Sequence, residues 1–421
     1  MTAYPLKSLR TLALATQRLH LPSGREPAAN AQTVLELIEQ LGCIQIDTLQ
    51  RVHRSQYLAV WSRLGSYSPA LLEALAYGGV DGHGQPIDRQ LFEFWFHASC
   101  YLPLSAYRFR KHRMRRAAAG GGSYTRAWLA KPGTTELLNK VYTRVNEEGP
   151  LRARDFEYDG RRQGTWWDWK PAKRALEHLF NCGDLMIAAR ENFQRVYDLT
   201  DRVLPDWVDQ EHPAEDETAR YVLETAARAL GVCELRQIAD YSHDYSRGEA
   251  RPYVEGMLAE GLLIPIQGQL AGGRVADLVV HRDNLPLLER VSSGEIKAER
   301  TTLLSPFDTL FYPQGRDEML WGFRQVLEAY KPAQQREWGY FCLPILDHDR
   351  LVGRLDPRLD RKIGTLRVEA LFLEPGVRPS QRLARSVAKA LRDFMRFHEA
   401  TNVIIERGQP LEFAASLERA L

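Results

Sequence analysis

The stretch Gln45-Ile46-Asp47 places an amide and a carboxylate two residues apart. In an extended segment, positions 45 and 47 project from the same face, while Ile46 points into the core. Their Cβ atoms would lie about 6–7 Å apart, which leaves room for one water molecule between them. A carboxylate there can take a proton from the water and stabilise an oxocarbenium-like sugar. The pair therefore suits hydrolysis at a sugar carbon.

The same aspartate has a structural alternative. Asp47-Thr-Leu-Gln50 nearly matches a capping box, in which an acid precedes a glutamine by three residues at the start of a helix. One residue could serve both purposes. Both interpretations of Asp47 stay open at this point.

The elements around this stretch follow a recognisable order. Apolar residues at helical spacing predict short helices over residues 6–19 and 30–41. The extended or turn-like piece CIQID comes next, and a helix is predicted over 49–64. A further helix over 68–79 precedes an aromatic, β-prone segment, 88–103, which predicts a hairpin. Helices followed by a hairpin are typical of a winged helix.

This order recurs twice, at roughly 90-residue spacing, without a strong sequence repeat. In the second unit the hairpin turns around RENF, and the third unit begins near residue 215. The acidic stretch 205–217 between them is interpreted as a solvated linker. We predict an α+β fold of three tandem winged helix-turn-helix domains with a C-terminal β-barrel-like α+β domain. The predicted boundaries are 1–118, 119–208 and 209–298 for the winged helices and 299–421 for the C-terminal domain.

The last 120 or so residues change character, with sheet signals replacing helical ones. Residues 338–376 predict three short strands, 379–400 a long helix and 402–406 a final strand.

Positive charge is concentrated in a few segments. Ten residues of YRFRKHRMRR hold six arginines and lysines and no acid. Such runs are usually solvated helix faces, yet six positives without an acid favour phosphate contact. His97, in the aromatic hairpin, is either a packed histidine or a residue that contacts the ligand. The predicted nucleic-acid contacts are Arg51, His53, Arg54, His97, Arg110, Arg113, Arg116, Arg161, Arg162, Lys170, Lys173, Arg174 and Arg195.

Composition sets outer limits on function. The chain has 421 residues and a net charge of only +2, so nucleic-acid binding must depend on local patches. Its five cysteines are scattered without a CxxC pair, which argues against structural zinc and suits a reducing compartment. The N-terminal residues do not form a signal peptide, and no stretch reaches the uncharged length of a membrane span. We expect a cytoplasmic protein without metal or cofactor.

Three segments carry a resemblance to a known family. They are LGCIQIDTLQRVHRSQYLAVWSRL, WKPAKRALEHLFNCGDLMIAARENFQRVYDLTDRVLP and LLSPFDTLFYPQGR with the later GYFCLPILDHDRLVGRLDPRLDR. In this order they resemble the AlkZ/YcaQ-type winged-helix DNA glycosylases. The resemblance implies three winged helices around a basic, C-shaped cleft and a β-rich C-terminal domain. It also implies a DNA-acting protein of the bacterial nucleoid.

The implied activity is excision of bulky or cross-linked N-alkylated purines from duplex DNA, without lyase activity. The family signature is Gln, an aliphatic residue, then Gln or Asp, which here is Gln45-Ile46-Asp47. The Gln/Asp form resembles the broader-specificity, YcaQ-like branch. An N7- or N3-alkylated purine is already cationic and leaves without a general acid, so one aspartate and one water-orienting glutamine form a sufficient set.

The family-marker segment LLSPFDTLFYPQGR carries Ser305, Asp308 and Arg316. We predict a structural role for it: an Asp308–Arg316 ion pair that joins the C-terminal domain to the third winged helix.

Two other functions compete with the glycosylase. A non-catalytic DNA-binding regulator would need a dimerisation surface and no Asp47, whereas a nuclease would need a carboxylate cluster for paired metals. Three tandem units can span a duplex, so we expect a monomer.

Overall fold

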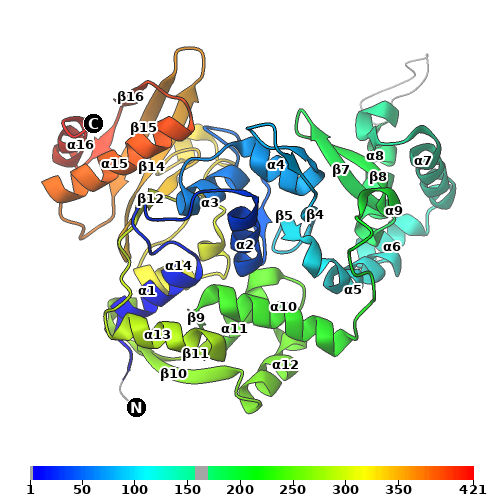
Figure 1. Cartoon of the computed structure of the whole chain (residues 1–421), viewed down its shortest axis with the longest axis horizontal. Helices are drawn as coiled ribbons and strands as arrows, with labels where there is room; N and C mark the ends of the chain where they lie inside the picture. Colours follow the sequence, from blue (N-terminus) through cyan, green and yellow to red (C-terminus); the bar gives the residue numbers. More distant parts are fainter. Residues whose placement is uncertain (1–2, 157–168) are drawn as a thin grey trace.

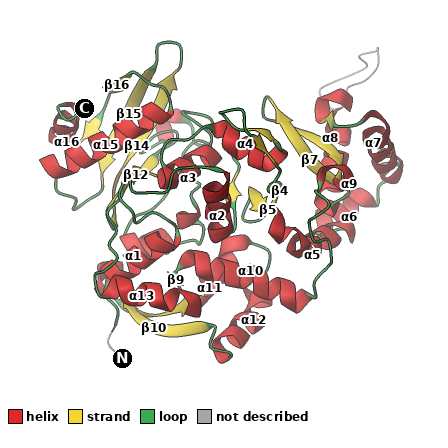
Figure 2. Ribbon diagram, viewed as in Figure 1, coloured by secondary structure: helices red, strands yellow, loops and turns green. Residues whose placement is uncertain are grey.

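The first of the three repeated units occupies the middle of the molecule (Figure 1). The computed structural model describes residues 3–156 and 169–421. The second unit lies on one side of the first, the C-terminal sheet on the other, and the third unit below both (Figures 1 and 2). Among the described residues, no helix is both long and apolar enough to cross a membrane.

The first unit combines helices with a small antiparallel sheet of order β1-β5-β4. Its first helix is capped reciprocally by Asn30 and Thr33 and ends at Gly42, whose φ of 76° is left-handed. The elements are α2 (Ala31–Leu41), β1 (Ile44–Gln45), α3 (Ser55–Leu64), α4 (Pro69–Tyr77), β4 (Leu91–Trp95) and β5 (Ser99–Pro103), with a small ribbon of β2 (Gly79–Val80) and β3 (Pro86–Ile87).

The second unit has the same connectivity, with sheet order β6-β8-β7. Its elements are α7 (Thr134–Glu148), β6 (Leu151–Arg152), α8 (Trp169–Cys182), β7 (Leu185–Glu191), β8 (Gln194–Leu199) and α9 (Thr200–Val203), reached through α5 (Tyr107–Ala118) and α6 (Ser123–Leu129). The β7–β8 hairpin turns at Asn192 and Phe193, which both have positive φ, 48° and 66°. The predicted hairpin around RENF is therefore confirmed.

The third unit repeats the pattern with sheet order β10-β11-β9. Its elements are α10 (Glu215–Leu230), β9 (Val232–Cys233), α11 (Leu235–Ser242), α12 (Arg247–Ala259), β10 (Leu263–Gln269), β11 (Val275–His281) and α13 (Leu285–Ser292). In all three units a short strand after the first helix pairs with the last strand of the hairpin.

The N-terminal helix α1 (Leu6–Thr16) packs with the third unit rather than the first. Leu9 and Leu12 share a core with Ile266, and Gln17 donates from Nε2 to the Ala229 carbonyl at 2.7 Å. Helix α1 thus covers a unit whose last helix, α13, ends some 280 residues later in the chain. The predicted domain boundaries stay predictions.

A six-stranded sheet with three helices forms the C-terminal region. The strands are β12 (Thr301–Leu303), β13 (Leu343–Asp347), β14 (Arg350–Asp360), β15 (Thr365–Leu373), β16 (Asn402–Ile405) and β17 (Gly408–Gln409), and the helices are α14 (Arg316–Trp321), α15 (Gln381–Phe397) and α16 (Leu411–Glu418). Register shifts within β13–β14 and β14–β15 bend the strands, which suits a half-barrel. The expected long helix and final strand are present, but β14 and β15 form a long hairpin rather than short strands.

Buried polar contacts fix α3 to the C-terminal region. Arg63 pairs with Asp308 through two bonds of 2.7 and 2.8 Å, and both side chains are fully buried. Ser55, the first residue of α3, hydrogen-bonds Ser305. The predicted Asp308–Arg316 pair is wrong: Arg316 instead donates to the carbonyls of Leu230 and Val232 in the third unit. The marker segment thus contacts the first unit through the Arg63–Asp308 pair and the third unit through Arg316.

Candidate active site

The Gln45-Ile46-Asp47 segment is extended along the edge of the first sheet. Gln45 lies opposite Cys100, and the Ile46 N–H donates to the Ser99 carbonyl at 2.8 Å. Ile46 is buried in the core, and alternation along an extended segment would turn Gln45 and Asp47 to the other face. Both polar residues are half-buried. The same-face geometry predicted for the pair is therefore compatible with the backbone.

Asp47 does not cap α3, since that helix begins eight residues later, at Ser55. The carboxylate instead accepts the Leu49 N–H at 2.7 Å, which closes a local turn, and the Asp47 N–H donates to Gln56 Oε1 at 3.3 Å. Burial raises the pKa of Asp47, against the opposing effect of the backbone N–H groups of Leu49 and Thr48. The capping-box alternative is wrong, and the helix predicted over 49–64 is shorter at its start.

The basic residues after the motif contact neighbouring units rather than Asp47. Arg51 forms an ion pair with Glu369 on β15. The His53 ring lies 4.3 Å from that of Tyr57 and 5.7 Å from that of Phe397, and burial lowers its pKa to about 3. These contacts join the motif to the C-terminal region.

Arg54 reaches in the opposite direction, to the second unit. Its guanidinium lies 3.7 Å from the ring centre of Phe193, and Arg190 covers the same ring at 4.2 Å. Phe193 is at the tip of the β7–β8 hairpin, so the positive φ of this turn places an aromatic ring between two arginines. Phosphate contacts from Arg51, His53 and Arg54 stay predictions, but all three side chains already have protein partners.

A buried glutamate, Glu93 on β4, connects the two hairpins. It is 1% exposed and accepts two bonds from Arg190, at 2.6 and 2.7 Å, and one from Tyr77. Arg195 lies 3.5 Å from the same carboxylate and donates to Ser99 Oγ at 2.8 Å. Because Ser99 also pairs with Ile46, the second unit supports the strand that carries the motif. Glu93 was not anticipated from sequence, where a single acid in an aromatic hairpin gives no signal.

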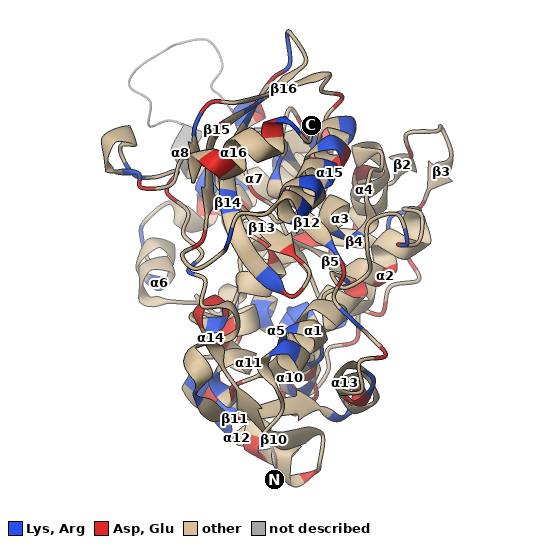
Figure 3. Ribbon diagram, turned by 90° about the vertical axis from the view of Figure 1, so that its left-hand side faces the viewer, with Lys and Arg blue, Asp and Glu red and all other residues tan. Residues whose placement is uncertain are grey.

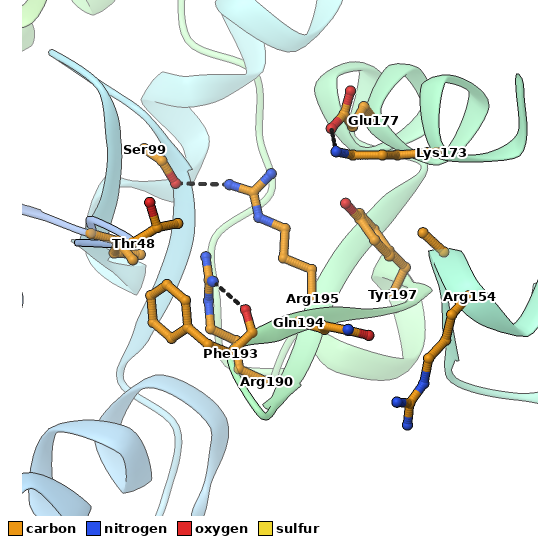
Figure 4. A pocket seen from close by; sticks show the side chains of 12 residues that line it. Thr48, Ser99, Arg154, Lys173, Glu177, Arg190, Phe193, Gln194, Arg195 and Tyr197 are labelled. Atoms are coloured by element: carbon orange, nitrogen blue, oxygen red, sulfur yellow. Dashed lines mark hydrogen bonds and ion pairs between the residues drawn. The ribbon is translucent and has the colours of Figure 1, made fainter. Parts of the chain in front are cut away.

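A cavity of about 450 Å³ lies between the first and second units (Figure 4). Thr48 and Ser99 face it from one side, and Lys173, Glu177 and Tyr197 from the other (Figure 4). Ile46 and Thr48 line this cavity, whereas Gln45 and Asp47 do not. The cavity therefore opens beside Ile46 and Thr48 and not beside Gln45 or Asp47.

The basic helix α5 is largely neutralised by acids from distant segments. Arg110 is 2% exposed and pairs with Asp244 at 2.5 Å, and Arg113 contacts the same carboxylate at 3.1 Å. Arg116 is more exposed, with Glu249 at 3.8 Å. Burial at this interface removes Arg110 from the predicted DNA contacts, while Arg113 and Arg116 stay predictions.

The acidic stretch 205–217 is not simply a solvated linker. Arg108 pairs with Asp209 at 2.9 Å and with Glu217 at 3.3 Å, and Lys111 donates to the Gln210 carbonyl. This stretch thus helps to hold α5 against the third unit.

His97 is packed in an aromatic cluster. Its ring stacks on Tyr312 at 4.0 Å between centroids and lies 4.2 Å from His243. Burial is the main cause that lowers its pKa to about 4, so the ring is neutral at pH 7. The structure thus favours the packed alternative, and contact with DNA is untested.

The remaining predicted contacts lie in the second unit. Lys173 is 3.9 Å from Glu177 and lines the cavity, and Arg174 covers the rings of Tyr124 and Trp128 at 4.6 and 4.4 Å. Outside the described part of the chain lie Arg161, Arg162 and the side chain of Lys170.

Comparison with known proteins defines the class of protein as a DNA glycosylase. The family described as "DNA glycosylase AlkZ-like" matches residues 38–397, which include the motif, all of the three units except the start of α2, and most of the C-terminal region. The chain belongs to this family. Among solved structures it is similar to the Streptomyces sahachiroi DNA glycosylase AlkZ, with a TM-score of 0.62 over 96% of this chain and 100% of that chain. Sequence identity is 16%, so this likeness shows the fold alone.

Proposed function

We propose that this DNA glycosylase hydrolyses the N-glycosidic bond of N7-alkylguanine- and N3-alkyladenine-type bases in duplex DNA, with Gln45 and Asp47 holding the attacking water. The observation that carries the proposal is the extended backbone anchored to β5, where Gln45 pairs with Cys100 and the Ile46 N–H donates to the Ser99 carbonyl. Alternation along such a segment would project Gln45 and Asp47 from one face. Both side chains are half-buried, and ideal strand geometry would set their Cβ atoms about 6–7 Å apart, a gap that one water fills.

The electrostatics of Asp47 suit a general base. The arginines that follow the motif are engaged with Glu369 and with the Phe193 ring, so they do not neutralise Asp47. Burial raises the pKa of Asp47, and a more basic carboxylate takes a proton from water more readily. The same negative charge stabilises the oxocarbenium-like sugar as the cationic base departs. No general acid is required for such a leaving group.

Three features extend the proposal. We infer that the three units are winged helices, because in each unit a short strand pairs with the hairpin that ends the unit. They would form the predicted C-shaped cleft along a duplex and act as a monomer. A cross-linked base cannot rotate freely out of the helix, so excision along such a cleft would also allow unhooking of interstrand cross-links. The packing of Arg51, His53 and Arg54 onto neighbouring units would hold the motif rigidly at this cleft.

The test is base release from duplexes that contain N7-methylguanine or a nitrogen-mustard cross-link, with EDTA present. We expect free base and an intact abasic strand that breaks only after alkali treatment. Asp47→Asn should lose roughly 10²–10⁴-fold in single-turnover rate, and Gln45→Ala should also slow excision. Asp88→Asn, a change at an exposed aspartate of the same unit, should act as wild type.

The pH profile gives a second readout of the same proposal. Excision should fall on the acid side as Asp47 becomes protonated, with a midpoint above the ordinary pKa of an aspartate. If Asp47→Asn and Gln45→Ala both excise at the wild-type rate, the mechanism is wrong. DNA binding without base release by the wild type would favour a regulator instead.

A further inference from the structure

Helix α15 carries a stripe of five exposed cations along one face. One side of this 17-residue helix is buried through residues such as Leu383, Val387, Leu391 and Phe394. The α15 stripe consists of Arg382, Arg385, Lys389, Arg392 and Arg396, all exposed. Their spacing of three and four residues places them in a row on a helix. Figure 3 shows blue segments along the length of α15.

Few acids balance this charge. Asp393 lies 3.1 Å from both Lys389 and Arg396, and Asp347 lies 3.0 Å from Arg382. Arg385 has no ion pair among the described residues. Helix α5 has more acids near it: Asp209, Glu217, Asp244 and Glu249 face its six cations, whereas Asp347 and Asp393 face the five of the stripe. The α15 stripe is therefore a stronger local source of positive charge in a chain whose net charge is only +2.

The stripe leads towards the catalytic motif. At the C-terminal end of α15, Phe397 packs against His53 and lies 6.1 Å from the Trp61 ring of α3. The adjacent hairpin tip continues the contact, because the Thr401 N–H donates to the Gly364 carbonyl at 2.8 Å and Arg361 donates to the Val52 carbonyl. A polyanion that follows the stripe would thus arrive beside residues 51–54.

We propose that the α15 stripe binds the phosphates of the duplex arm on the C-terminal side of the lesion. The stripe spans 14 helical steps, about 21 Å at 1.5 Å per residue. That length matches about six nucleotide steps of 3.4 Å along one strand. Long, flexible cationic side chains on one rigid face suit contacts with a regular backbone that are independent of base sequence. The second unit would face the opposite arm.

The test is binding to an undamaged duplex over a range of salt concentrations. We expect the triple variant Arg385→Gln, Lys389→Gln, Arg396→Gln to bind roughly tenfold or more weakly at low salt, with the slope of log K against log[salt] reduced by about 2.7, or 0.9 for each lost contact. The control triple variant Lys7→Gln, Arg290→Gln, Lys297→Gln removes the same charge from exposed positions on or beside α1 and α13. Both helices lie below α15 in Figure 1, next to the strands of the third unit.

Two readouts separate this surface from the catalytic proposal. Because the duplex is undamaged, the binding result does not depend on Gln45 or Asp47. At saturating enzyme, the α15 variant should excise an alkylated base at the wild-type single-turnover rate. Equal salt slopes and affinities in the α15 variant and the control would overturn the proposal. The stripe would then be a candidate surface for an acidic protein partner. Unchanged thermal melting of both variants would show that they remain folded.

Discussion

Removal of Asp308 tests how the marker segment holds α3 in place. Its carboxylate accepts two bonds from Arg63, at 2.7 and 2.8 Å, and one from the Leu310 N–H at 3.0 Å. Asp308→Ala would leave the Arg63 guanidinium charged and fully buried. Breaking such a pair from one side costs about 3–5 kcal/mol. At about 2–4 °C per kcal/mol for a cooperative unit of roughly 150–250 residues, we expect a fall in Tm of about 6–20 °C.

Differential scanning calorimetry measures this change, with Glu255→Ala as the matched control. Glu255 pairs with Arg251 on α12 at 2.7 Å, but both side chains are largely exposed, so that variant should lose less than about 1 kcal/mol. A Tm for Asp308→Ala no lower than that of the control would refute the reasoning. The double variant Arg63→Met, Asp308→Leu should recover much of the loss, because two apolar side chains leave no buried charge unpaired.

Two further predictions concern contacts around the motif. Burial lowers the pKa of His53 to about 3, so the folded protein binds fewer protons than the unfolded chain below pH 6.5 and loses stability as pH falls towards 3. His53→Phe should make denaturant-derived stability fall less steeply between pH 6.5 and 4, by up to about 1.4 kcal/mol per pH unit, and an unchanged slope would contradict this. Arg190→Ala should destabilise the protein by about 3 kcal/mol in urea melts, because Glu93 stays buried. Arg251→Ala should not destabilise the protein in this way. Equal destabilisation by the two arginine variants would contradict the role of Glu93 as a buried ion-pair partner that joins the two hairpins.

Local patterns were sufficient for much of the fold. Helical periodicity predicts α2, α4 and α15, and the Asn192-Phe193 turn follows from polar and turn-forming residues between two β-prone runs. The start of α3 was not predictable in this way. Residues 49–54 have a helical pattern, but the Asp47 side chain closes a turn with Leu49 and the Arg51 carbonyl accepts the Leu359 N–H of β14 at 3.3 Å. A partner some 300 residues away decides the conformation.

The candidate pair Gln45 and Asp47 comes from a local pattern, and its catalytic role stays a prediction. Positions two apart in an extended segment share a face whatever surrounds them. The partner of Asp308 was not predictable. Nothing in the marker segment indicates that Arg63, and not Arg316, lies against Asp308. Charge-pair identity depends on how units dock, and docking is set by surfaces far apart in the chain.

The two basic helices, α5 and α15, show that the sequence does not indicate which positive charges have acidic partners in the folded protein. Charge density favours α5, yet Asp244 neutralises Arg110 and Arg113 from more than 130 residues away. In α15 the cations are diluted by apolar residues, and this dilution is what places them on one exposed face. A dense basic run must turn some of its charges towards the protein, where acids are needed to balance them. Evenly spaced cations on an amphipathic helix stay exposed, as the five of α15 do, so spacing predicts an exposed basic surface better than density does.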